Sequence, residues 1–436
     1  MAGQKPLQPP VQVFVQQDAH GASRVGEDFG FHFLEHGQHL RTLHAREAVQ
    51  KHLDGIARLQ VVEEASHRDA RALEDQRAAE NLRVGMIGAL LLQWRTVASE
   101  TAWSKLGVRF PFRILLAMQR ILRDQARKFV LDWREEPQLR VQPGEAFEIE
   151  TWDASSGYFK TEADKAIPGN RPGFDRIPAM ANPLGGPVFV EGAERGDTLV
   201  VHIEDILVAD YSWIAIGPRR GPLGESTRWP ELSGEYTTKI LRHTPGPSGT
   251  MRDGTVHFSD RISWPVTPFI GTLGNAPDRE VCTSIDGQGE WGGNLDIRDV
   301  AVGNKIFLPV HHAGARFYLG DVHASQGDTE FTGTAAETCS TVRLRFEVLK
   351  GKKLPWMRIE KPDALIALHA AKPLEEAVKT ATFHLMDWLI REHNFTPTDA
   401  YCLVSTCPDF RINVYQMCNI GKLSYVAGAE IPKKYL

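Results

Sequence analysis

The stretch GDVHASQGDTE, residues 320–330, places a dense set of polar side chains between apolar segments typical of strands, 315–319 and 331–336. Three acids, one imidazole and one amide fall within it: Asp321, His323, Gln326, Asp328 and Glu330. Buried charges need a partner, a metal ion or a catalytic use. Because residues two apart share one face of an extended chain, we expect Asp321 to lie beside His323 and Asp328 beside Glu330.

Carboxylate oxygens and one imidazole form a ligand set that suits zinc or a harder divalent ion. The alternative is an ordinary turn, in which Asp, Ser, Gln and Gly act as loop formers. Two further segments favour a site. GGNLD at 292–296 holds Asn294 two residues from Asp296, and PVFVEGAERGDTLVVHIED at 187–205 carries Glu191 within a predicted β-hairpin.

Five segments, in this order, resemble the acetamidase/formamidase family. They are NPLGGPVFVEGAERGD (182–197), TPFIGTLGNAP (267–277), GGNLD (292–296), LPVHHAGARFYLGDVHASQGDTE (308–330) and DAYCLVS (399–405). The resemblance runs from about residue 143 to 436. It implies a mainly β fold, a homo-oligomer, and hydrolysis of short aliphatic amides to a carboxylate and ammonia. Some members open cyclic amides. His311, His312 and Thr329 depart from the usual family wording.

Hydrolysis of an unactivated amide requires a nucleophile, a proton donor for nitrogen and stabilisation of the oxyanion. A metal-activated water supplies the nucleophile, because its pKa falls to about 7. On the motif positions, we expect a divalent metal, zinc by preference, on Asp296, Asp321 and His323. Glu330 or Glu337 would be the acid/base, Gln326 and Asn294 would orient the substrate, and Glu191 would complete either set.

Other mechanisms find less support in the sequence. It has neither a GGSS-type serine amidase stretch nor a G-x-S-x-G elbow, and Ser155-Ser156-Gly157 is predicted to be a turn. Cys282 is the best cysteine candidate for a nucleophile, although a core cysteine is the more ordinary interpretation. A cyclic amide hydrolase using the same site and a non-catalytic β-rich binding module remain alternatives. No nucleotide is expected, since no Gly-rich phosphate loop follows a strand.

Composition sets limits on compartment and partners. The 436 residues are 42% hydrophobic and 24% charged, with a net charge of −5, which favours neither nucleic acid nor an anionic membrane as a partner. Five cysteines without a C-x-x-C pair indicate reduced thiols. The longest apolar run, 84–92, is too short to span a bilayer, and the N-terminus has no signal pattern. These features predict a cytoplasmic protein.

The chain divides into two unlike parts. Seven of the sixteen histidines lie in the first 67 residues, and the helix-compatible stretch at 41–81 has few apolar positions. We predict that residues 1–115 form an extension, disordered or partly helical, and that 116–436 form the catalytic domain.

Within the second part, short Val-, Ile-, Phe- and Thr-rich segments alternate with turn residues. This pattern predicts a mainly β (α+β) fold of the sandwich or barrel type with a few packing helices. One helix is predicted from Pro373 to His393 by its apolar spacing. The predicted strands are 146–151, 188–190, 198–207, 255–258, 305–310, 315–319, 341–348, 400–405, 411–416 and 423–427.

Overall fold

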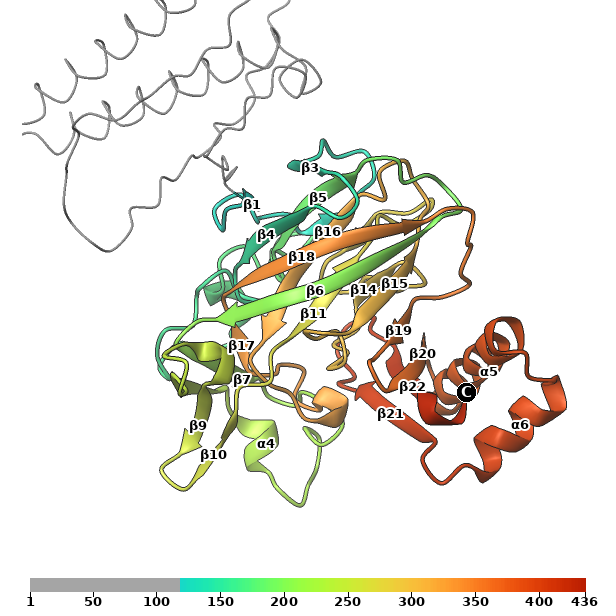
Figure 1. The fold of residues 1–436 in the computed structure, drawn as a ribbon. Helices are drawn as coiled ribbons and strands as arrows, with labels where there is room; N and C mark the ends of the chain where they lie inside the picture. The colour runs from blue at the N-terminus through green and yellow to red at the C-terminus, as the bar shows by residue number, and fades with distance from the viewer. Residues whose placement is uncertain (1–117) are drawn as a thin grey trace, which may run out of the picture. The chain divides into compact units, whose positions relative to one another are not determined.

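The computed structural model describes residues 118–436, and the predicted extension over residues 1–115 lies outside the described residues. The described part, Met118–Leu436, is one unit built mainly of β-sheet, as the sequence predicts (Figure 1). Two large sheets form it, and both remain open within residues 118–436. Of the two predicted architectures, the sandwich is therefore confirmed and the closed barrel is not.

The first sheet has nine strands in the described part of the chain. In pairing order they are β1 (Gln119–Ile121), β4 (Ala146–Thr151), β18 (Ser340–Leu349), β6 (Thr198–Val208), β15 (Lys305–Pro309), β19 (Arg358–Glu360), β20 (Ala364–Ala371), β22 (Tyr425–Pro432) and β21 (Arg411–Gln416).

The second sheet has eleven strands among the same residues. Nine pair in the order β10 (Ile262–Pro265), β9 (Thr255–Ser259), β8 (Thr237–Thr244), β7 (Tyr211–Ile216), β17 (Glu337–Thr338), β16 (Phe317–His323), β11 (Phe269–Gly274), β14 (Gly292–Asn294) and β13 (Gln288–Gly289). Beside them, β5 (Leu184–Val190) pairs with both β16 and β3 (Leu139–Val141), and β12 (Cys282–Thr283) pairs separately with β2 (Val130–Leu131).

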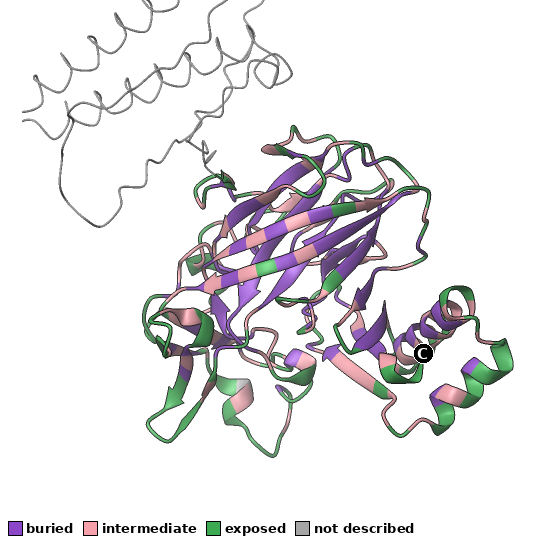
Figure 2. Ribbon diagram, in the orientation of Figure 1, coloured by how far each residue is buried: buried purple, intermediate pink, exposed green. Residues whose placement is uncertain are grey.

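The two sheets pack face to face because their strands alternate between apolar and polar residues. Along β18, Val342, Leu344 and Phe346 are fully buried, whereas Arg343 and Arg345 face outward (Figure 2). The Phe346 ring lies 5.0 Å from that of Phe317 on β16, across the interface between the sheets. This alternation is the period-two pattern of a half-buried strand. β16 differs in that all seven of its residues are buried.

Helices cover the C-terminal end of the first sheet. α5 (Leu374–His393) follows Pro373, as predicted, and buries Leu385, Trp388 and Leu389 against β20 and β22 (Figure 1). α6 (Pro397–Thr406) packs beside it. The remaining helical turns are short: α4 (Glu231–Gly234), η1 (Pro168–Asn170), η2 (Met251–Asp253), η3 (Asp328–Glu330) and η4 (Lys433–Tyr435). No helix among residues 118–436 is long and apolar enough to cross a membrane.

Three local predictions are wrong. Residues 400–405 lie in α6 and not in a strand, because Thr396 caps the helix by accepting a hydrogen bond from the Asp399 N–H and Pro397 opens it. The strand expected at 315–319 begins at Phe317, since Ala315 and Arg316 adopt φ values of 56° and 58°. Residues 331–336 form an irregular segment that leads into β17.

Candidate active site

The buried strand β16 ends in the two residues that first marked the site. Asp321 and His323 are 2% and 1% exposed, and His323 Nε2 lies 3.6 Å from Asp321 Oδ1. The structure thus brings the pair together as expected, although Asp321 has a φ of 56° and departs from regular strand geometry. Neighbouring strands enclose the pair, because β11 and β17 both pair with the end of β16.

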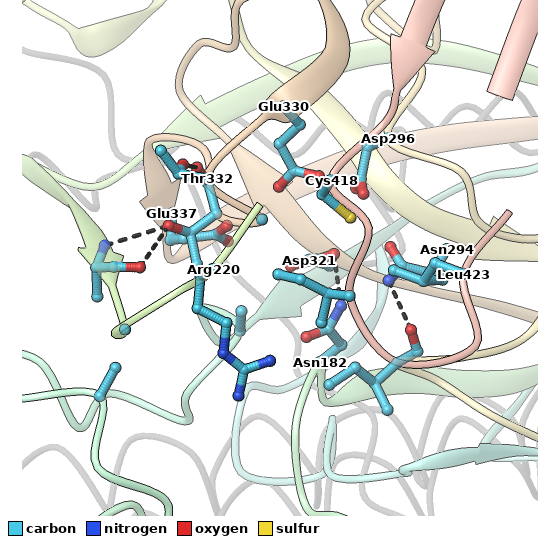
Figure 3. A pocket seen from close by; sticks show the side chains of 18 of the residues that line it. Asn182, Arg220, Asn294, Asp296, Asp321, Glu330, Thr332, Glu337, Cys418 and Leu423 are labelled. Carbon is cyan, nitrogen blue, oxygen red and sulfur yellow. Dashed lines mark hydrogen bonds between the residues drawn. The ribbon is translucent and has the colours of Figure 1, made fainter. Parts of the chain in front are cut away.

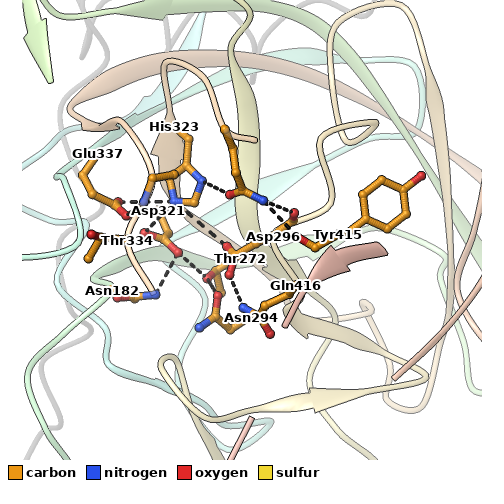
Figure 4. Close-up of polar contacts among 12 residues, drawn as sticks. Asn182, Thr272, Asn294, Asp296, Asp321, His323, Thr334, Glu337, Tyr415 and Gln416 are labelled. Carbon is orange, nitrogen blue, oxygen red and sulfur yellow. Dashed lines mark hydrogen bonds and ion pairs between the residues drawn. The ribbon is translucent and has the colours of Figure 1, made fainter. Parts of the chain in front are cut away.

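Two further carboxylates converge on the same imidazole nitrogen. Glu337, which opens β17 directly opposite His323, places Oε2 at 3.3 Å from Nε2. Asp296, two residues after β14, places Oδ1 at 4.0 Å (Figure 4). Glu330 reaches the cluster from η3 and is 8% exposed. Four carboxyl groups and one histidine, separated by up to 41 positions in sequence, therefore form one buried cluster, which we call the acid–histidine cluster.

Each of three carboxylates is held through one of its two oxygens. Asp321 Oδ2 accepts a hydrogen bond from Asn182 Nδ2 at 2.8 Å, and Asp296 Oδ2 accepts one from the Gln416 amide. Glu337 Oε1 accepts one from the backbone N–H two residues earlier, at 3.0 Å. Such outer contacts fix the orientation of a ligand and leave its second oxygen available.

The second oxygens have no hydrogen-bond partner within residues 118–436, although they are buried. The same is true of the imidazole nitrogen at the centre. The unpartnered atoms are Asp296 Oδ1, Asp321 Oδ1, Glu337 Oε2 and His323 Nε2. Buried polar atoms are rarely left unpaired, so a convergent group of four indicates a site for a further species.

His323 is held with Nε2 facing this group. Its Nδ1 lies 3.0 Å from Gln326 Oε1, while Gln326 Nε2 donates to the backbone oxygens of Asp296 and Tyr415. Gln326 Oε1 is therefore the acceptor, and Nδ1 carries the hydrogen. Phe269 packs edge-on against the ring at 5.0 Å. Gln326 was predicted to orient substrate, but the structure commits its amide to His323 and the backbone.

Burial and mutual repulsion shift the pKa values of the cluster. Burial is the largest influence on His323 and lowers its pKa, but Glu337 and Asp321 together raise it well above the ordinary value. Burial raises the pKa of Asp296 to about 7, against the opposing effect of His323. Burial and then Asp296 raise the pKa of Glu330 well above its usual range. Carboxyl groups this close disfavour one another's charge, and a divalent cation among them would relieve that cost.

The arrangement fits a metal ion. Two overlapping groups share His323, one completed by Asp296 and Asp321 and the other by Glu330 and Glu337, and in each group the ligand atoms lie within 4.8 Å of one another. One imidazole with several carboxylates is a donor set for zinc or for a harder divalent ion. The first group consists of the three ligands expected from the sequence.

The cluster forms one side of a cavity of about 100 Å³ (Figure 3). Its lining includes Asn182, Asn294, Cys418 and two arginines, Arg171 and Arg220. Asn294 was expected here, and its amide N–H donates to the Ile285 backbone oxygen. Three other hollows of the described part measure 510 to 620 Å³, and none of them is lined by more than one carboxylate of the cluster.

The structure does not bring Glu191 or Asp328 to the site. Glu191 follows β5 at the end remote from Asp321, roughly 20 Å away along the strand at about 3.3 Å per residue, and pairs with Arg140 at the surface. Asp328 pairs with Arg298 instead of lying beside Glu330. Positive φ angles at Thr329 (75°) and Glu330 (45°) turn the two carboxylates apart.

The candidate covalent nucleophiles lie in unsuitable surroundings. Burial raises the pKa of the Cys282 thiol, and that of Cys418 beside the cluster, to about 12, so both are protonated thiols at neutral pH. Ser155 lies in a turn, as predicted, and its hydroxyl accepts a hydrogen bond from Arg171.

Several residues of the site were not anticipated. Asn182 and Thr272 lie inside segments that carry the family resemblance, so their positions were a usable signal. Gln416, Arg171 and Arg220 come from segments with no recognisable motif.

Comparison with known proteins gives the same assignment as the motifs. The sequence profile of the acetamidase/formamidase family matches residues 117–287 and 275–423. An acetamidase of Mycolicibacterium smegmatis is 28% identical in an alignment 268 positions long, which covers 48% of this chain and 63% of the relative. A formamidase of Methylophilus methylotrophus is 27% identical in an alignment 240 positions long, which covers 44% of this chain and 56% of the relative. These matches span about three fifths of the length of each relative.

The fold is similar to that of solved acetamidases. The crystal structure of an acetamidase from Bacillus halodurans superposes with a TM-score of 0.63 at 30% sequence identity. The superposition covers 72% of this chain and 98% of that structure. The motif order, the sandwich of two sheets and the profile match agree, and the chain belongs to the acetamidase/formamidase family.

Proposed function

We propose that this chain hydrolyses short aliphatic amides to a carboxylate and ammonia. One observation carries the proposal: four buried atoms without hydrogen-bond partners, on Asp296, Asp321, His323 and Glu337, converge beside a cavity of about 100 Å³. Pockets for drug-sized ligands measure about 300–1,000 Å³, so this cavity suits a substrate of only a few heavy atoms. Family membership supports the same reaction.

We assign Asp296, Asp321 and His323 as the residues that would hold a divalent ion, with zinc as the preferred metal. When bound, such an ion supplies an activated water and polarises a carbonyl group. Asn182 and Gln416 hold Asp321 and Asp296 in place, because each donates a side-chain amide hydrogen to a carboxylate oxygen. Gln326 keeps the proton on His323 Nδ1 and so leaves Nε2 as the ligand atom.

Glu330 is the best placed residue for proton transfer. It lines the cavity beside the carboxyl group of Asp296, and burial together with Asp296 raises the pKa of Glu330 well above the ordinary value. Glu337, by contrast, is fixed by a backbone N–H and by its proximity to His323. We therefore assign Glu330 to take the proton of the attacking water and deliver it to the leaving nitrogen, which ordinarily contributes about 10²–10⁴ in rate.

The substrate amide can be oriented by the asparagines that line the cavity. Asn182 and Asn294 each donate one amide hydrogen within the chain, to Asp321 and to the Ile285 backbone. The second hydrogen of each side-chain amide makes no hydrogen bond within the described residues and is available to a substrate oxygen. Trp213, Phe159 and Leu423 supply apolar wall.

Ammonia release from formamide, acetamide, propionamide and a five-membered lactam tests this function. The proposal predicts turnover of the linear amides that is lost in Asp321→Asn, a variant of the same shape. Preference for the lactam would favour the cyclic-amide alternative. If a normally folded protein released no ammonia from any of these amides, the result would favour the alternative of a non-catalytic β-rich binding module.

We further propose that the protein works in the cytoplasm as a homo-oligomer. All five cysteines are unpaired, which suits a reducing compartment. Light scattering on the purified chain tests the assembly, and a monomer at micromolar concentration would contradict it.

A further inference from the structure

Two arginines line the cavity that also holds the acid–histidine cluster. Arg171 follows η1, and Arg220 lies in the loop after β7. Figure 3 shows the Arg220 guanidinium on the side of the pocket away from Glu330 and Asp296. The cavity therefore has acidic groups that can bind a cation and, beside Glu337, two cationic side chains. A neutral amide offers a guanidinium only its carbonyl oxygen and carries no negative charge to match two arginines.

Arg171 is poorly compensated where it lies. Its Nη2 donates to Ser155 Oγ at 2.7 Å, and its guanidinium lies 3.8 Å from the centre of the Phe174 ring. Its Nε is buried without a hydrogen-bond partner, and no carboxylate of residues 118–436 lies within ion-pair distance. Burial lowers its pKa to about 10, against the opposing effect of Glu337 and Asp153, which lie too far away to form ion pairs with it. An arginine in such a position is costly unless an anion joins it.

Arg220 is placed by a tightly constrained turn. Gly221 has a φ of 72°, and a Cβ there would lie 1.8 Å from the Phe331 backbone oxygen, so only glycine permits this approach. The contact fixes the Arg220 backbone beside the segment that carries Glu330. Within the described chain, the Arg220 guanidinium makes neither an ion pair nor a hydrogen bond, and its planar donors are free to bind a carboxylate.

From this geometry we infer that Arg171 and Arg220 form a subsite for a carboxylate on the acyl part of the substrate. The substrate class would be the monoamides of short dicarboxylic acids. The inference rests on the proposed amide hydrolysis and narrows its substrate. One water is consumed, the C–N bond breaks, and the monoamide anion becomes a dicarboxylate dianion and an ammonium ion. The small cavity limits the spacer to a few carbons.

The test compares substrates that differ only in the charged group. Malonamate is matched with propionamide and succinamate with butyramide, because a methyl group replaces the carboxylate in each neutral partner. We expect the wild-type kcat/KM to favour the anionic member by at least about tenfold, the order expected for one charge-assisted hydrogen bond. The KM for malonamate should rise with salt, as the attraction is electrostatic.

Arg220→Met is the decisive variant, because Arg220 is exposed and its loss should not impair folding. It should lower the malonamate-to-propionamide ratio of kcat/KM at least about tenfold. Arg219→Met, a neighbouring exposed arginine outside the cavity lining, should leave the ratio unchanged.

The outcomes separate this inference from the proposed function. Hydrolysis of propionamide without preference for malonamate, or an equal loss on both substrates in Arg220→Met, would overturn the subsite alone. An equal loss on both substrates would mean that Arg220 only offsets the negative charge of the acid–histidine cluster. Absence of hydrolysis of all four amides would overturn the amidase proposal itself.

Discussion

Gly271 shows at the level of a single residue how closely the acid–histidine cluster is packed. It lies on β11, opposite the end of β16. A Cβ at this position would lie 2.5 Å from Asp296 Oδ1 and 3.0 Å from His323 Cε1. Contacts that short do not occur without movement of one partner, so the absence of a side chain at Gly271 makes room for the cluster.

Gly271→Ala should therefore displace Asp296 or His323. We expect kcat for acetamide to fall by at least about tenfold, since misplacement of about 1 Å in a catalytic group can cost a hundredfold. Gly327→Ala is the matched control, because a Cβ there meets no atom within 4 Å. Equal activity of the two variants would show that the cluster tolerates displacement and would weaken its assignment as the site.

Glu330→Gln separates proton transfer from packing, because it keeps the shape of the side chain. We expect kcat to fall by about 10²–10⁴ with little change in KM or melting temperature. Asp328→Asn, two residues away and paired with Arg298 at the surface, should leave kcat unchanged. Steady-state ammonia release measures both. Wild-type turnover in Glu330→Gln would transfer the acid/base role to Glu337.

The residues that sequence alone could predict are those inside the motifs. Asp296, Asp321 and His323 were expected together, because two-residue spacing in strands and the GGNLD and QGD segments marked them. Glu191 was expected at the site, but it follows the end of β5 that lies far from Asp321 and pairs with Arg140 there. The position of that end relative to the site depends on how β5 pairs with β16, which the hairpin sequence does not reveal. Arg171 and Gln416 reach the cavity through tertiary packing that no local pattern encodes.

At the scale of elements, α5 was predicted from helical spacing and α6 was not. The apolar face of α5, with Leu385 and Leu389, repeats at 3.6 residues and is visible in the sequence. α6 is short, and its apolar residues fit either periodicity. Its capping residue Thr396 and the following Pro397 were the discriminating signals.

α5 also carries an acid-sensitive histidine. Both ring nitrogens of His384 are buried without hydrogen-bond partners, and its ring centre lies 5.5 Å from that of His369. Burial, followed by His369, lowers the pKa of His384 from 6.5 to about 4, with Asp387 opposing. The folded state thus binds fewer protons than the unfolded state between these two values.

This difference contributes stability that is fully present above about pH 6.5 and is lost as the pH falls towards 4. After discounting for partial exposure, the loss should be about 1–2 kcal/mol. His384→Leu should lose correspondingly less stability between pH 7 and 4.5 in urea unfolding. His257→Leu, an exposed histidine on β9, should behave as wild type. Identical pH slopes for wild type and His384→Leu would contradict this account.

At the scale of the whole molecule, both sheets, the helices and the cavity lie within Met118–Leu436. A chain lacking residues 1–110 should therefore keep its melting temperature and its kcat. Expression of this truncated chain beside the full chain, with thermal unfolding and ammonia release, is the measurement. An insoluble or inactive truncated chain would show that the N-terminal part contributes to the fold or to the assembly.

The central claim is that the acid–histidine cluster holds a metal ion that amide hydrolysis requires. Metal content per chain, measured by mass spectrometry alongside ammonia release, tests it most directly. We predict one divalent ion per chain in active protein, because the two ligand groups share His323. Chelation should remove the ion and the activity together, and His323→Ala should lack both while remaining folded. A preparation that is free of metal and fully active would contradict the account.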